Sequence, residues 1–64
     1  MSQTDQILNH LKRYGTIEPM KAWKLYGSYR LAARIHDIRA KGHRIDTEKV
    51  EKGKVSFARY RLVR

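Results

Sequence analysis

The stretch LYGSYRLAARIHDIRAKGHRI, residues 25–45, combines a regular apolar spacing with a large excess of basic side chains. Leu31, Ile35 and Ile38 recur at i, i+4 and i+7, a spacing that places them on one face of a helix. Ser28 is a favourable N-cap for this helix, and Gly42 is a favourable residue for its end. The pattern predicts a helix with one buried face, whose opposite face is either solvated or in contact with an acidic partner.

The opposite face of this predicted helix carries side chains that favour contact with DNA. We expect it to present Tyr29, Arg30, Ala33, His36 and Asp37, with Arg34 at its edge. The candidates for DNA contact in this stretch are Ser28, Tyr29, Arg30, Ala33, Arg34 and Asp37. Four basic residues and one acid between positions 28 and 41 give a net charge of +3. Arginine suits the O6 and N7 atoms of guanine, and an alanine methyl can contact the thymine methyl. The alternative is a solvated face whose arginines only confer solubility.

A first helix is predicted over residues 4–14, with Thr4 as its N-cap and Gly15 after its end. Its apolar side chains follow the spacing i, i+1, i+4, i+7: Ile7, Leu8, Leu11 and Tyr14. The β-branched pair Thr16 and Ile17 then predicts a short strand at a sheet edge.

A second helix is predicted from Pro19, which suits a first helical turn, to the residue before Gly27. Its core face is expected to hold Ala22, Leu25 and Tyr26, flanked by Met20 and Trp23. We interpret Met20 and Trp23 as the rim of the core against the first helix; the alternative is an exposed surface for a protein partner. Lys21 and Lys24 are candidates for phosphate contacts, because the first helix of a helix-turn-helix crosses the DNA backbone.

After Gly42 the periodicity changes to that of a β-hairpin, with strands over residues 44–51 and 54–62 around the turn EKGK. Ala58, Tyr60 and Leu62 alternate and are expected to face the helices, whereas Phe57 falls on the outer face or at the base of the hairpin. The segment from Lys52 to Arg64 holds five basic residues and no acid. Lys52, Lys54 and Arg59 are therefore candidates for DNA contact. The alternative is a charged hairpin whose lysines protect an edge strand from aggregation.

These elements predict an α+β fold, a winged helix-turn-helix with three helices followed by a C-terminal β-hairpin wing, as a single domain over residues 1–64. The stretch GTIEPMKAWKLYGSYRLAARIHDIRAKGHRIDTE and the closing FARYRL resemble the small winged helix-turn-helix proteins of phages and prophages. The resemblance covers roughly residues 4–62. It implies DNA binding as a repressor, a regulator or an accessory factor for recombination. The chain departs from that pattern at Glu18, where a Ser or Thr cap is more usual before Pro.

The charge balance indicates a polyanionic partner. Fifteen Lys and Arg stand against six Asp and Glu, a net charge of +9 over 64 residues. A chain of this size has a small core and no room for an enzyme cleft beside it. The chain has no Cys, and its three His do not follow the spacing of metal ligands. We therefore expect neither a metal site nor a cofactor. No apolar run reaches the ~20 residues of a membrane span, so we expect a cytoplasmic, nucleoid-associated protein without a membrane partner.

Three functions remain open from the sequence. The first is a double-stranded DNA binder, either a transcription regulator or an excisionase-like recombination directionality factor. The second is an inhibitor module that binds a phage or host protein on a winged-helix scaffold. The third is an RNA binder, which needs exposed aromatic rings, and only Tyr29 and Phe57 are expected to be available. A single module covers little DNA, so a homo-oligomer or a cooperative array on DNA is expected.

Overall fold

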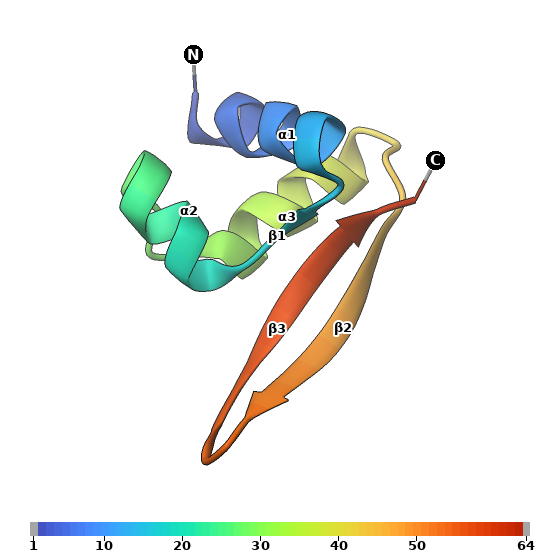
Figure 1. Cartoon of the computed structure of the whole chain (residues 1–64). Helices are drawn as coiled ribbons and strands as arrows, with labels where there is room; N and C mark the ends of the chain where they lie inside the picture. The colour runs from blue at the N-terminus through green and yellow to red at the C-terminus, as the bar shows by residue number, and fades with distance from the viewer. Residues whose placement is uncertain (1, 64) are drawn as a thin grey trace.

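The structure, a computed structural model that describes residues 2–63, contains three helices and three strands (Figure 1). In chain order they are α1 (Gln3–Tyr14), β1 (Thr16–Ile17), α2 (Pro19–Tyr26), α3 (Leu31–Ala40), β2 (Ile45–Lys52) and β3 (Val55–Leu62). This order confirms the α+β winged helix-turn-helix that the sequence predicts.

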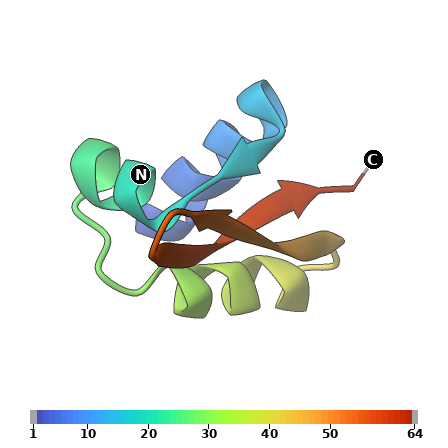
Figure 2. The same cartoon turned by 60° about the horizontal axis from the view of Figure 1, so that its bottom comes forward.

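The three strands form one antiparallel sheet in the order β1-β3-β2. Thr16 pairs with Arg61 and Ile17 with Tyr60, which confirms the predicted short edge strand. The β2–β3 hairpin turns at Gly53 with a φ of 60°, a left-handed conformation that glycine adopts without steric cost. The hairpin extends beyond the helices, and in both views its turn lies at the same end of the molecule as α2 and the start of α3 (Figures 1 and 2).

The core lies where α1, α3 and the inner face of the sheet meet. Its buried hydrophobic members are Ile7, Leu8, Leu11, Ile17, Ala22, Leu31, Ile35, Ile38, Ile45 and Tyr60. Ala58 and Leu62 pack against this cluster beside Tyr60, so the predicted inward face of the second hairpin strand is confirmed. Leu31, Ile35 and Ile38 occupy the buried face of α3, which confirms the helical register.

Two predicted helix caps are wrong. Ser2, not Thr4, caps α1, because its side-chain oxygen accepts a hydrogen bond from the Asp5 amide at 3.2 Å. Ser28 does not cap α3, which begins at Leu31. Its amide instead donates to the Ala22 carbonyl at 3.3 Å and closes the end of α2, where Gly27 is left-handed. Ser28 therefore belongs to the end of the preceding helix.

The predicted packing of α2 is partly wrong. Ala22 is buried and Tyr26 is half-buried, but Leu25 is 56% exposed, Met20 61% and Trp23 48%. Tyr26 anchors α2 to α1 through a 2.9 Å hydrogen bond between its hydroxyl and His10 Nδ1. Because this helix of eight residues meets the core along one narrow side, Met20 and Trp23 do not form a rim against α1.

Candidate nucleic-acid interface

The face of α3 opposite the core is open and built from small side chains. Ala32, His36 and Ala40 are exposed, and Ala33 is half-buried. Small side chains let a helix approach the floor of a major groove closely. Tyr29 and Arg30 precede the helix rather than lying on it, since Arg30 is its N-cap residue. Both are exposed, so they extend this face at its amino end.

Arg39 connects the end of α3 to the hairpin. Its Nε and Nη2 atoms donate to the Ile45 carbonyl at 3.1 and 2.6 Å, and Nη2 also donates to Thr47 Oγ1 at 3.0 Å. Arg39 lies in the last turn of α3, where a cation suits the negative end of the helix dipole. These bonds hold the first residues of β2 against α3, so Arg39 positions the hairpin relative to the helix.

Arg34 and Asp37, both candidates for DNA contact, pair with each other. Arg34 Nη2 lies 3.4 Å from Asp37 Oδ2, one helical turn apart. The pair lies on the side of α3 away from Arg39, and Arg34 lines a shallow depression with Gln3 and Gly27. The positive charge of Arg34 is therefore partly balanced before any ligand arrives.

Arg30, Lys52 and Lys54 make no ion pair within residues 2–63. Lys52 and Lys54 flank Gly53 at the hairpin turn and are exposed. Lys49 and Glu51 on the same hairpin pair with each other at 3.2 Å. The turn therefore presents two lysines whose charges are not balanced by neighbouring carboxylates in the described chain.

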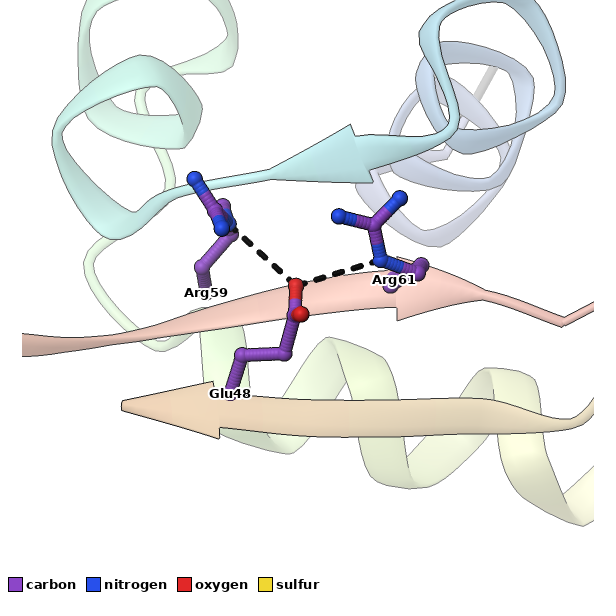
Figure 3. A network of polar contacts seen from close by, with 3 residues as sticks. All are labelled: Glu48, Arg59 and Arg61. Atoms are coloured by element: carbon purple, nitrogen blue, oxygen red, sulfur yellow. Dashed lines mark hydrogen bonds and ion pairs between the residues drawn. The ribbon is translucent and has the colours of Figure 1, made fainter. Parts of the chain in front are cut away.

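Arg59 lies on the other face of the sheet from α3. Glu48 Oε1 accepts hydrogen bonds from Arg59 Nε at 3.3 Å and from Arg61 Nε at 3.2 Å, with α3 behind the strands (Figure 3). Burial works to raise the pKa of Glu48, but the bonds and charges of the two arginines together lower it. The structure thus does not bring Arg59 together with the turn before α3.

Lys21 lies with Arg59, apart from the candidates at the start of α3 and at the hairpin turn. It lines a cleft between α1, β1 and α2 together with His10 and Arg59. His10 is buried, and that burial together with the charge of Lys21 lowers the pKa of its imidazole, against an opposing hydrogen bond that the imidazole donates to the backbone of Thr16. Lys24, one turn further along α2, is exposed.

Six of the eleven candidates form one group, and the remaining five are Lys21, Lys24, Arg34, Asp37 and Arg59, of which Arg34, Asp37 and Arg59 form ion pairs. The turn before α3, the open face of α3 and the hairpin turn lie at one end of the molecule, and they hold Ser28, Tyr29, Arg30, Ala33, Lys52 and Lys54. Sequence reasoning omitted Ala32 from this face, although its position one residue after Leu31 places it well off the buried side.

No group of His, Asp and Glu within residues 2–63 could hold a metal ion. None of the helices in this part of the chain is both long and apolar enough to cross a bilayer.

Two helices joined by a turn, an open third-helix face and a basic hairpin define a winged helix-turn-helix module. The chain belongs to the family described as winged helix-turn-helix domain, whose model it matches over residues 2–64. No curated protein and no solved structure matches the chain.

Proposed function

We propose that this chain binds double-stranded DNA, as a transcription regulator or an excisionase-like recombination directionality factor of the phage and prophage type. One observation carries the proposal. Arg30 before α3 and Lys52 and Lys54 at the hairpin turn make no ion pair within residues 2–63, whereas Arg34, Lys41, Lys49, Arg59 and Arg61 pair with carboxylates. Unpaired cations therefore stand at the amino end of α3 and at the hairpin turn of a chain whose net charge is +9.

In the proposed complex α3 enters the major groove with its amino end first. Arg30 reaches a guanine edge or a phosphate, while Ala32, Ala33 and His36 lie toward the bases. Lys52 and Lys54 follow the phosphate backbone or the adjacent minor groove. Lys24 on α2 adds a phosphate contact, because the first helix of the motif crosses the backbone.

The test is selection from a random duplex library, followed by titration of the enriched duplex and a scrambled duplex. A DNA-reading protein should enrich a short motif and bind it at least about 1,000-fold more tightly than the scrambled sequence if it acts as an oligomer or array. Binding of a single palindromic site favours a regulator, whereas cooperative filling of repeated sites favours a recombination factor. Failure to retain any duplex at low salt would contradict DNA binding.

A further inference from the structure

Two buried side-chain polar atoms, one in the turn between α2 and α3 and one in α3, have no hydrogen-bond partner within residues 2–63. These atoms are Ser28 Oγ and Arg34 Nε. They line two depressions on either side of Tyr29, one with Ser28 and one with Arg34. Leaving a buried polar atom without a partner is destabilising, so these two atoms indicate a place where a ligand supplies the missing partners.

The depression beside Ser28 is an apolar groove of about 330 Å³ lined by Pro19, Met20, Trp23, Ser28, Tyr29 and Leu31. The Trp23 and Tyr29 rings are tilted with centroids 6.4 Å apart, near the far end of the roughly 4.5–7 Å over which aromatic rings interact. Tyr29 is 86% exposed and Trp23 48%, so both rings present surface to which a flat aromatic ligand can stack. Ser28, only 4% exposed, lies beneath them with a hydroxyl that can donate or accept.

The depression on the other side of Tyr29 is basic. It is lined by Gln3, Gly27, Tyr29, Arg30 and Arg34. No carboxylate lines either depression, and Asp37 neutralises only part of the charge of Arg34. An apolar groove beside two arginines matches a nucleotide, which joins a flat aromatic base to an anionic phosphate.

Charge also argues against a second copy of the chain as the occupant. Each copy carries +9, and Arg30 and Arg34 line the adjoining depression, so docking two copies here would place like charges together. A DNA strand carries the opposite charge and already lies next to this turn in the proposed complex.

We propose that the α2–α3 turn binds one unpaired nucleotide of a DNA strand, with the base stacked on Trp23 and Tyr29 and the phosphate beside Arg30. The proposal rests on the proposed DNA binding and adds a preference for DNA with an unpaired end or an extruded base. Stacking of one base on exposed aromatic side chains strengthens binding of unpaired strands, and every base has a face that can take part.

Trp23 is the single tryptophan of the chain, so its fluorescence reports on the groove directly. The experiment titrates the protein with a blunt DNA hairpin, with the same hairpin carrying a three-nucleotide overhang, and with that overhang made abasic. We expect the overhang to quench Trp23 and to tighten binding about 5- to 100-fold over the blunt duplex, and the abasic overhang to lose most of this gain.

Tyr29→Ala should reduce the ratio of overhang to blunt affinity to less than about threefold, because one wall of the groove is lost. Tyr14→Ala removes another exposed tyrosine, on α1 and outside the groove, and should leave the ratio unchanged.

Equal affinity for blunt and overhang duplexes would overturn the nucleotide site while leaving DNA binding intact. Absence of binding to all three duplexes would overturn both proposals. Emission that shifts with protein concentration alone, together with a dimer in sedimentation, would assign the groove to a second copy.

Discussion

Three arginines at α3 differ in their surroundings, and those surroundings separate structural from binding roles. Arg39 donates to the Ile45 carbonyl, and Arg34 pairs with Asp37. Arg30 makes no ion pair with the rest of the described chain and is exposed at the amino end of the helix. Arg30 is therefore the residue whose loss should affect DNA binding without affecting the fold.

Replacing Arg30 with Ala should leave the melting temperature nearly unchanged, because the side chain is exposed and outside the core. Affinity for the selected duplex should fall by about 1–3 kcal/mol if the guanidinium makes a bidentate base contact, with a smaller loss on scrambled DNA. Arg13→Ala is the matched control, since Arg13 stacks on Tyr14 in α1, away from the interface. Melting curves and duplex titrations measure both; equal losses for the two variants would refute this role for Arg30.

His10 predicts a pH dependence of stability. Burial and the charge of Lys21 hold the pKa of His10 below the ordinary value of about 6.5, so the unfolded chain takes up a proton more readily than the folded one. The free energy of unfolding should be constant above that value and should decrease as the pH falls below it, until the folded pKa is reached.

Urea denaturation between about pH 7.5 and pH 5 measures this effect. His10→Gln should flatten the profile, whereas His36→Gln, which alters an exposed histidine, should retain it. Parallel profiles for the wild type and His10→Gln would show that another group causes the loss of stability.

At the scale of elements, the hydrogen bonds that Arg39 of α3 donates to Ile45 and Thr47 of β2 fix the orientation of the hairpin relative to α3. Arg39→Ala removes the hydrogen bonds to the Ile45 carbonyl and to Thr47, and we expect a loss of about 1–2 kcal/mol because the guanidinium is partly screened by solvent. Arg39→Lys should not restore it, since an ammonium cannot form the same fork. Lys41→Ala breaks only the exposed contact of 3.6 Å with Asp5 and should cost less than about 0.5 kcal/mol. Thermal melts compare the three; equal stability of the Arg39→Ala and Lys41→Ala proteins would contradict the role of Arg39.

The wing is predicted to contact phosphates rather than bases. Changing Lys52 and Lys54 together to Ala should weaken binding to every duplex by a similar factor and reduce the salt slope by about two. Lys49→Ala, on the same hairpin but paired with Glu51, should have a smaller effect. A changed preference at particular bases in titrations of the double variant would mean that the wing reads sequence.

Apolar spacing predicted the elements well, because a period of 3.6 or 2 directly reflects which face is buried. It located α3, the hairpin and the inward face that holds Tyr60. It failed for Trp23, since spacing shows that a face is apolar but not whether another element covers it. It also failed for the α3 cap, because Ser28 suits a cap equally well in the preceding turn.

The candidate interface was predictable as a set of basic residues but not as a surface. The sharing of Glu48 by Arg59 and Arg61 depends on strand register, and the bond from Arg39 to Ile45 depends on how the hairpin returns to α3. In both cases an arginine makes contacts within the protein that its position in the sequence does not reveal. Among the basic candidates for DNA contact, Arg34 and Arg59 form ion pairs within the protein. The candidates without an ion pair in residues 2–63 lie on α2, before α3 and at the hairpin turn.

For the whole molecule, the distribution of charge is the main basis of the proposed activity. The chain carries +9, and Arg30, Lys52 and Lys54 make no ion pair with the carboxylates of residues 2–63. Binding of a polyanion by such a surface releases counterions from the DNA, so affinity must depend steeply on salt. A protein partner bound through the apolar groove would not produce that dependence.

The salt dependence of duplex binding tests the central claim most directly. Fluorescence anisotropy of a labelled duplex, measured at several salt concentrations, gives the slope of log K against log salt. If about five phosphates are neutralised, the slope should lie near −4 to −5. A slope flatter than about −2, or no binding at the lowest salt, would contradict a phosphate-contacting DNA interface at α3 and the wing.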